Sequence, residues 1–589
     1  MPFYPTVEET RASQQVTDTF MGYNHNLKIM EGEFYDMKNM TSDYCPMLAN
    51  RGKRGVVKRL ENPGGILAKE KLACVDNGKL YYDGVEVPGI ELTLGEKQLV
   101  SMGAYLVIWP DKVFVNTSDL TDHGSIDANV HITSNLKFEL CEADGKVIEN
   151  YATSKPASPK NGDYWLDTST TPHSLKKYYS YSNSWSTVAS SYLKLSATGI
   201  GSQFKKYDGV TISGIAYPAT EDTDQTLIEE YDGLNTTKVI YLLDEDYIVI
   251  LGLVSELLTL ETCDVTIERK SPDLDYVTEA SNRIWGCKYG VVDDKPVNEI
   301  YCCSLGDFRN WNEFQGISTD SYVASVGTDG KWTGAITHLG YPIFFKENVM
   351  HKVYISPIGA HQIQDTACRG VQEGCNKSLA IVGERLYYKS RSGIMMYDGS
   401  LPVSISDVLG QDKFFDAVAG AVDNKYYISM RDENYEFGMY VYDTAKELWH
   451  KEDNTNALCF TKSGSELFYV DVDSKLLMSV NGTVGEEEGP VEWSATTGVI
   501  GYNTVEQKYV SRFNIRMKLP KGSSADMFIE YDSDGVWNHC GHMNGVGTNT
   551  FMLPVRPKRC DHFRFRIEGT GDVRVYSISK IFEAGSDTL

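Results

Sequence analysis

The chain of 589 residues carries 56 lysines and arginines against 81 aspartates and glutamates, which gives a net charge of −25 and a pI near 4.9. A surface of this sign repels DNA and anionic membranes, so a freely diffusing nucleic-acid binder is disfavoured. The 41% hydrophobic content argues against disorder, and the 37 tyrosines and 51 glycines favour strands joined by turns.

The chain shows no targeting or membrane segment. Its start, MPFYPTVEETRAS, lacks the basic and apolar regions of a secretory signal. The longest apolar run, YIVILGLVSELLTL, has 14 residues and contains Glu256, so it is too short and too polar to span a bilayer. We therefore expect a soluble protein made in a cytoplasm, with no membrane span.

Basic residues cluster near the N-terminus in the stretch RGKRGVVKR. They are Arg51, Lys53, Arg54, Lys58 and Arg59. A solvated strand pair or a contact with an acidic neighbour is the simpler interpretation, and a phosphate-binding patch is the alternative. We assign residues 1–60 to an N-terminal arm and the first strands of the next part.

Short hairpins then recur along most of the chain. Each has an apolar and aromatic run, a tight polar turn and a second run, as in KLYYDGVEV and RLYYKSRSGIMMYDG. Aromatic pairs that begin at Phe344, Tyr387, Tyr426 and Phe468 are 43, 39 and 42 residues apart, a spacing typical of four-stranded propeller blades. Weaker pairs begin at Leu80, Ile108 and Ile284. We predict an all-β chain with a propeller of six to eight blades, built from residues 61–135 and 276–489.

The spacing breaks between residues 136 and 275, which we assign to an inserted β-rich domain. This segment is rich in Ser, Thr, Pro and Tyr. Some of its aromatic residues could form a platform on which sugars stack, although core packing or subunit contact is the simpler interpretation. These residues are Tyr164, Trp165, Tyr178, Tyr179 and Trp185.

The sequence pattern changes again in residues 490–589. Alternating runs such as SRFNIRMKL and DHFRFRIEG are separated by Gly and Asp turns. This pattern predicts a C-terminal β-sandwich or jelly roll.

Motifs that would carry chemistry are missing or incomplete. There is no Walker loop, GxGxxG, GxSxG or HExxH. His539, Cys540 and His542 are zinc-compatible types, but neighbouring residues of a strand face opposite sides. Carboxylate pairs that cleave glycans converge only in space, and no pair stands out. We predict no cofactor, no metal site and no enzymatic activity.

Twelve scattered cysteines contain no CxxC pattern, and Cys302 and Cys303 are adjacent. Strand alternation sends these two thiols to opposite faces, where each is expected to pack as a small buried hydrophobe. Trp311, a few residues later, is the expected anchor between two blades.

The stretches NRIWGCKYG, IYCCSLGDFRNWNEF and GYPIFFKENVMHKVY, together with the N-terminal GYNHNLKIMEGEFYDMKN, resemble the tail stabilization proteins of double-stranded DNA bacteriophages, which are hub or nozzle components. The similarity covers the N-terminus and the propeller region, about two-thirds of the chain. The matching residues are Arg283, Ile284, Trp285, Gly286, Ser304, Gly306, Asp307, Trp311, Phe344, Phe345 and Lys346.

This resemblance implies a structural protein of the virion. It would form a homo-oligomeric ring, a hexamer in expectation, below the portal and adaptor. The ring would contact other tail proteins, help to retain packaged DNA and form the channel for its exit. The alternative is a tail protein that binds a receptor or a host-surface glycan during adsorption.

Overall fold

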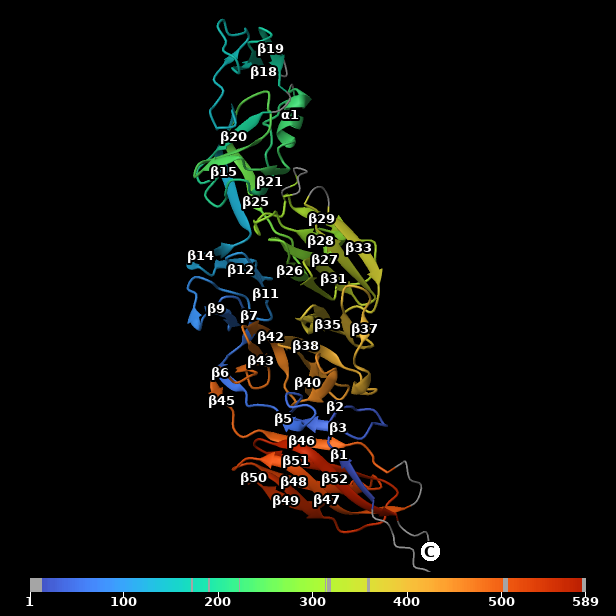
Figure 1. The fold of residues 1–589 in the computed structure, drawn as a ribbon. Helices are drawn as coiled ribbons and strands as arrows, with labels where there is room; N and C mark the ends of the chain where they lie inside the picture. The colour runs from blue at the N-terminus through green and yellow to red at the C-terminus, as the bar shows by residue number, and fades with distance from the viewer. Residues whose placement is uncertain are drawn as a thin grey trace, which may run out of the picture.

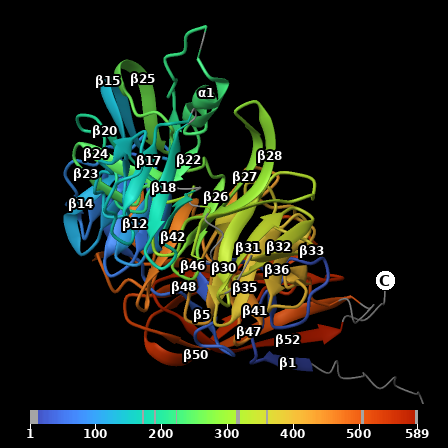
Figure 2. The same ribbon diagram turned by 90° about the horizontal axis from the view of Figure 1, so that it is seen from above.

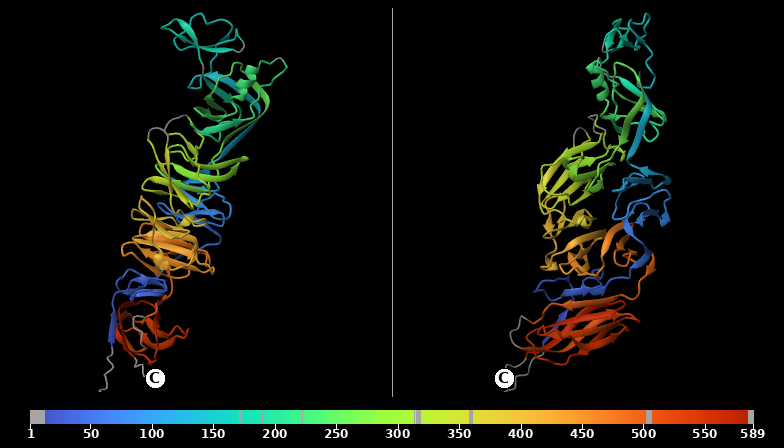
Figure 3. Two further views of the ribbon diagram at one scale, coloured as in Figure 1. Left: turned by 90° about the vertical axis from the view of Figure 1, so that its right-hand side faces the viewer. Right: turned by 180° about the vertical axis from the view of Figure 1, so that it is seen from behind.

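The computed structural model describes residues 13–170, 173–188, 191–221, 223–312, 314, 319–357, 361–501 and 507–584. The chain is almost entirely β, and its three parts lie in a row (Figure 1). An inserted domain occupies one end, a propeller the middle and a sandwich the other end. The same row is visible in both views of Figure 3.

Seven small sheets form the propeller, so the predicted fold class is confirmed and the blade number is seven. In most blades the first strand packs on the first strand of the next blade, and β42 of the last blade packs on β7 of the first blade, which closes the ring. Blades 1 to 3 contain β7 (Pro63–Ala68), β8 (Leu72–Asp76), β9 (Lys79–Tyr82) and β10 (Val85–Glu86); β11 (Gln98–Met102), β12 (Tyr105–Trp109), β13 (Val113–Asn116) and β14 (Asp119–Ser125); β26 (Tyr276–Glu279), β27 (Ile284–Val292), β28 (Lys295–Cys302) and β29 (Tyr322–Ser325).

The other four blades follow without interruption. They contain β30 (Gly334–His338), β31 (Tyr341–Lys346), β32 (Val349–Tyr354) and β33 (Gln362–Ala367); β34 (Ala380–Val382), β35 (Arg385–Ser390), β36 (Gly393–Tyr397) and β37 (Val403–Ser404); β38 (Phe415–Val422), β39 (Lys425–Arg431), β40 (Phe437–Asp443) and β41 (Leu448–Lys451); β42 (Ala457–Ser463), β43 (Glu466–Asp471) and β44 (Leu476–Ser479) with β6 (Gly55–Arg59) and β45 (Glu486–Glu487).

Blade 7 closes the ring with a strand from the N-terminal segment. Strand β6 pairs antiparallel with β44, so that Lys58 lies opposite Leu477. Chain segments more than 400 residues apart in sequence are thereby held in one sheet. The edge of β44, which would otherwise be unpaired, is covered by β6.

The inserted domain leaves blade 2 and returns to blade 3. Two long strands, β15 and β25, pair along their length from Ala128 opposite Arg269, so the insert begins earlier and ends earlier than the predicted 136–275. Its elements are β15 (Ala128–Cys141), β16 (Tyr151–Ala152), β17 (Tyr164–Asp167), β18 (Ser174–Tyr179), β19 (Ser184–Thr187), β20 (Tyr192–Ser196), β21 (Gly209–Ser213), α1 (Gln225–Asp232), β22 (Thr237–Val239), β23 (Leu242–Asp244), β24 (Tyr247–Leu251) and β25 (Thr259–Arg269).

The sandwich has two six-stranded sheets and draws on both ends of the chain. Residues 490–589 form most of it, as predicted, but the segment assigned to an N-terminal arm also supplies strands, because β3 pairs with β46 while β1 and β5 pair with β52. The N-terminal strands thus cover edges that would otherwise be unpaired. The strands are β1 (Ser13–Thr17), β2 (Gly22–Tyr23), β3 (Glu33–Lys38), β4 (Met40–Thr41), β5 (Leu48–Asn50), β46 (Glu492–Thr497), β47 (Lys508–Leu519), β48 (Ser524–Tyr531), β49 (Asn538–Asn544), β50 (Gly547–Pro554), β51 (Phe563–Thr570) and β52 (Arg574–Ala584).

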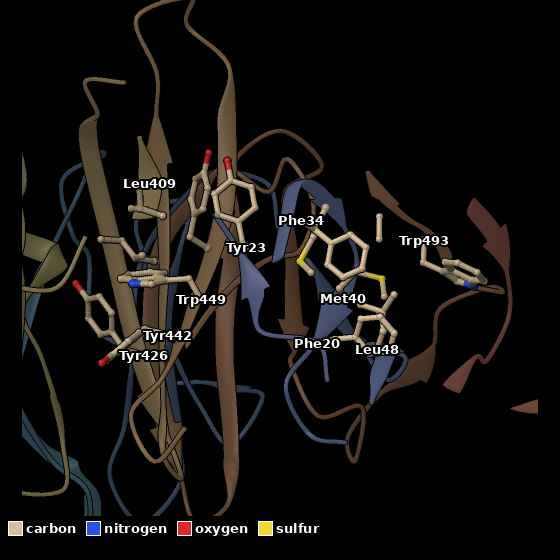
Figure 4. Close-up of a cluster of buried hydrophobic side chains, with 14 of the residues drawn as sticks. Phe20, Tyr23, Phe34, Met40, Leu48, Leu409, Tyr426, Tyr442, Trp449 and Trp493 are labelled. Atoms are coloured by element: carbon tan, nitrogen blue, oxygen red, sulfur yellow. The ribbon is translucent and has the colours of Figure 1, made fainter. Parts of the chain in front are cut away.

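One hydrophobic core runs from blades 4 to 6 through the N-terminal strands into the sandwich. Figure 4 shows Trp449 of blade 6 on one side, Phe34 and Met40 of the N-terminal strands in the middle, and Trp493 of the sandwich on the other. The insert has a separate core of its own, centred on residues such as Leu195.

Candidate functional site

The loop after β28, which carries most of the resemblance, lies where the insert meets the propeller. The Ser304 backbone N–H donates to the Asn310 carbonyl at 2.8 Å, and the Arg309 side chain pairs with Asp307 at 3.0 Å. Gly306 sits at a φ of +78°, where a residue with a side chain would be strained. The loop is therefore a tight turn that fixes the direction of Asn310.

Asn310 joins the two parts directly. It is 2% exposed, its Nδ2 donates to the Tyr207 carbonyl at 2.9 Å, and its Oδ1 accepts from the Gly209 backbone N–H at 2.7 Å. Between these two backbone groups stands Asp208, which is fully buried and forms an ion pair with Arg269. Arg269 Nε also donates to the Ile126 carbonyl at 3.0 Å. We call this set, Asp208, Arg269 and Asn310, the insert joint.

Trp311 packs between blades 2 and 3. Its ring lies 6.1 Å from that of Trp109 at an interplanar angle of 89°, and Cys303 belongs to the same buried cluster. Cys302 instead packs with Trp285 on the other side of blade 3. The two thiols therefore face opposite ways, as predicted, and burial raises the pKa of Cys302 to about 11.

The remaining family-motif residues are interior. Arg283 Nη1 donates to the Cys303 carbonyl at 2.9 Å, and a side chain at Gly286 would collide with Leu274. Lys346 is 1% exposed, donates to Asn298 Oδ1 at 3.0 Å and lies over the Trp332 ring. The fully buried residues of the same set are Ile284, Trp285, Phe344 and Phe345.

The basic stretch of residues 51–59 turns inward at the junction of propeller and sandwich. Arg51 and Arg54 are 7% and 3% exposed. Both pair with Glu452 and Asp453 at the end of blade 6, and Arg51 also pairs with Glu488. Burial acts to raise the pKa of Asp453, but the neighbouring guanidinium of Arg54 holds it below its usual value.

The other basic residues also face the chain itself or solvent. Lys53 pairs with Glu487 at 3.3 Å, Lys58 lies over the Tyr81 ring, and Arg59 is exposed. Contact with acidic neighbours therefore describes Arg51, Lys53 and Arg54. We call Arg51, Arg54, Glu452, Asp453 and Glu488 the sandwich joint.

All five aromatic residues singled out in the insert belong to the small sheet β16–β19. Trp165 is 6% exposed and packs edge-on to Trp185 at 5.5 Å, and Tyr178 lies 5.3 Å from Trp185. Tyr179 packs on Tyr181, which is 86% exposed and was not among the predicted residues. Tyr164 lies under the Lys177 ammonium. This sheet presents a partly exposed aromatic surface.

His539 and His542 share one carboxylate. Both rings contact Asp526, at 2.8 and 3.0 Å, on the exposed side of β48 and β49. Among the residues that the structure describes, no group of three or more metal-ligating side chains is arranged to hold an ion. In the same described ranges no helix is long and apolar enough to cross a membrane.

Sequence analysis missed Asp208, Arg269, Glu452 and Asp453, which hold the two joints. Asp208 and Asn310 are about 100 residues apart, and the acids of the sandwich joint follow the basic stretch by about 400. Asn310 stands inside the quoted family stretch, so its position next to Trp311 was the one available indication.

Comparisons with known proteins give little further guidance. No family model matches the chain, and no curated protein matches it by sequence. Among solved structures, an engineered GH43 glycoside hydrolase is similar at 8% identity over 53% of this chain and 97% of that one, with a TM-score of 0.19. A GH43 arabinoxylan arabinofuranohydrolase from Bacillus subtilis covers 51% and 94% at 10% identity, with a TM-score of 0.18.

A third structure, PorZ, is described as a surface component of the type-IX secretion system of Porphyromonas gingivalis. It matches at 12% identity over 75% of this chain and 66% of that one, with a TM-score of 0.12. With TM-scores this far below 0.5, these likenesses carry no argument about this chain.

Proposed function

We propose that the protein is a structural component of a bacteriophage tail, without catalytic activity. Copies would form a ring, as a hub or nozzle below the portal and adaptor, that helps to retain packaged DNA and provides the channel for its exit. The observation that carries the proposal is the position of the propeller between the insert and the sandwich, to each of which it is attached by buried contacts.

The residues that resemble phage tail proteins support this function because they build the frame. Trp311 packs blade 3 on blade 2, and its neighbour Asn310, which is not itself one of the matching residues, fastens the insert to the same loop. A rod fixed in this way keeps its two ends at a constant separation, which suits a part that must connect neighbours above and below. The acidic surface also suits a channel in which DNA must slide without sticking.

A cryo-electron microscopy map of the particle that contains this protein tests the proposal. We expect several copies around the tail axis, with the propeller in the wall of a channel. A peripheral spike, or a channel lining of strongly positive potential, would overturn it.

A second candidate function, glycan binding during adsorption, is favoured by one observation. Tyr178, Tyr179, Tyr181 and Trp185 gather on a small sheet that belongs to the end of the molecule farthest from the sandwich (Figure 1). Aromatic faces of this kind stack on sugar rings. A glycan array with the full chain tests it. Binding that Trp185→Ala abolishes and Tyr289→Ala, an exposed tyrosine of blade 3, leaves intact would support it. An array without signal would reject it.

A further inference from the structure

The negative charge of the chain is distributed unequally between the two ends of the molecule. Residues 61–489, which form most of the propeller and the whole insert, contain 36 lysines and arginines against 63 aspartates and glutamates. Residues 490–589 contain 12 against 11. The molecule is therefore strongly acidic over the propeller and insert and nearly neutral at the sandwich, so its charge differs from one end to the other.

Within the sandwich, the positive charge gathers on one strand. Strand β47 has the sequence KYVSRFNIRMKL, with four lysines and arginines and no acidic residue. Phe513, Ile515 and Met517 point into the core and are fully buried. Because a strand alternates its faces, Arg512, Arg516 and Lys518 point outward, and all three are exposed.

Neighbouring strands extend this surface. Arg574 of β52 lies opposite Lys518, while Thr550 and Met552 of β50 lie opposite Arg516 and Asn514. In Figure 2 the strands β1, β47, β50 and β52 lie together at the lower edge of the view. We call the outward residues of these strands the basic face: Arg512, Asn514, Arg516, Lys518, Thr550, Met552 and Arg574.

Within the described ranges, the outward cations of β47 have no acidic partner, whereas Arg574 lies over the Tyr44 ring at 3.7 Å. In the part of the chain that the structure describes, Arg512, Arg516 and Lys518 form no ion pair, and Arg516 makes only a 3.4 Å hydrogen bond to Thr550. This differs from the sandwich joint, where Arg51 and Arg54 are buried against carboxylates.

The basic face also carries an exposed apolar side chain. Met552 of β50, opposite Asn514, is 67% exposed. A docked surface would cover this side chain and add an apolar contact to the charged ones.

We propose that the basic face docks on the acidic part, residues 61–489, of a second copy of this chain. Charge complementarity selects this partner, because the same molecule supplies an excess of carboxylates over the rest of its length. Alternate residues of a strand are about 6.6 Å apart, so the outward cations form a row of about 20 Å that can meet several carboxylates at once.

This contact joins different surfaces of two copies, and a contact of that type closes into a ring when its rotation is a simple fraction of a turn. The inference therefore rests on the oligomer in the proposed function. Asp244, Glu245 and Asp246 form one exposed acidic turn in the insert that makes no ion pair in the described chain, and it belongs to the opposite end of the rod.

The test uses the full chain and a carbodiimide, which joins an amine to a carboxylate with no spacer. A mixture of chains labelled with ¹⁴N and ¹⁵N is cross-linked and digested. We expect mixed-isotope peptides that connect Lys518 to an aspartate or glutamate of residues 61–489. Links from Lys518 only within one chain, or none at all, would overturn the inference.

Sedimentation of two matched double variants completes the experiment. R512E/R516E reverses two charges on the basic face, and the control R556E/R559E reverses two exposed arginines of the loop after β50. We expect the first to weaken self-association at least tenfold and the control to change it less than twofold, with both variants folded by calorimetry.

The remaining outcomes separate this inference from the ring itself. An oligomer that persists equally in both variants would show that the basic face is not the interface, but it would not contradict the proposed ring. A chain that is monomeric in isolation and in the particle would sink both. If the wild-type chain binds DNA and R512E/R516E alone loses that binding, the occupant is a nucleic acid and the inference is wrong.

Discussion

The two joints of the molecule attach a β-domain to the propeller in opposite ways. The sandwich shares a continuous hydrophobic core with blades 4 to 6, to which Arg51 and Arg54 add buried ion pairs. The insert keeps its own core and meets the propeller through the polar contacts of Asp208, Arg269 and Asn310. A shared core makes two parts fold as one unit, whereas a polar joint allows each to keep its own stability.

A mutation in each core gives the sharpest separation. Phe34→Ala empties a fully buried site in the shared core and is expected to cost about 3–5 kcal/mol. Leu195→Ala makes a comparable cavity inside the insert core. We expect hydrogen exchange to rise in both propeller and sandwich for Phe34→Ala, but only in the insert for Leu195→Ala. If Phe34→Ala raised hydrogen exchange only in the sandwich, the propeller and sandwich would not fold as one unit.

The ion pairs of the sandwich joint give the next largest effect. Arg54→Met leaves Glu452, itself 3% exposed, with only the guanidinium of Arg51 at 3.7 Å, and the loss of the closer partner is expected to cost about 3 kcal/mol. Arg54→Met with Glu452→Gln removes the stranded charge and should recover part of that cost. Denaturant unfolding measures both. A double variant as unstable as the single one would show that Arg54 acts through packing instead.

The recurring hairpins were the part of the fold that sequence could predict. The aromatic pairs at Phe344, Tyr387, Tyr426 and Phe468 all fall in the second strands of their blades, β31, β35, β39 and β43. These strands are covered on both faces by neighbouring blades, which is why their apolar runs are continuous. Leu80 and Tyr81 misled the spacing, because they lie in β9, the third strand of blade 1.

The sandwich and the joints could not be predicted in the same way. Strands β1 to β5 have two to six residues each, and nothing in their composition indicates that they pair with β46 and β52 at the far end of the chain. Arg51 and Arg54 were recognisable as charged residues, but their partners follow by about 400 residues. Long-range pairing is set by complementary surfaces in three dimensions and leaves no periodicity in one.

At the insert joint, a smaller change should alter orientation without altering overall stability. Asn310→Ala removes two hydrogen bonds that cross the joint and leaves the Tyr207 carbonyl and the buried Gly209 N–H without this partner, which weakens the contact between insert and propeller by about 1–3 kcal/mol. We expect faster hydrogen exchange at residues 205–211 and a broader small-angle scattering profile, with an unchanged melting temperature.

Asn312→Ala is the matched control in the same loop, because Asn312 is more exposed and, among the described residues, its side chain makes one hydrogen bond, to the Lys270 carbonyl. It should change neither observable by more than a small fraction. Equal effects from the two substitutions would mean that the loop as a whole, and not Asn310, holds the insert.

The smallest expected effect depends on pH and distinguishes the joints once more. His450, in β41 beside the N-terminal strands, is fully buried, and neither ring nitrogen has a hydrogen-bond partner within the described residues. Burial holds the pKa of His450 well below its usual value, with Lys425 and Lys446 acting in the same direction and Asp43 against them. The insert joint of Asp208, Arg269 and Asn310 contains no histidine.

Because the folded protein resists protonation of His450 while the unfolded chain accepts a proton near pH 6.5, unfolding takes up a proton in acid. The stability of the unit formed by propeller and sandwich should therefore fall as pH drops below about 6.5, by up to about 1.4 kcal/mol per pH unit from this group. Denaturant unfolding between pH 7.5 and 5.5 measures the slope, and His450→Phe should flatten it. His131→Gln, which removes an exposed histidine of the insert, should leave it unchanged. A slope that survives His450→Phe would assign the acid sensitivity to groups other than His450.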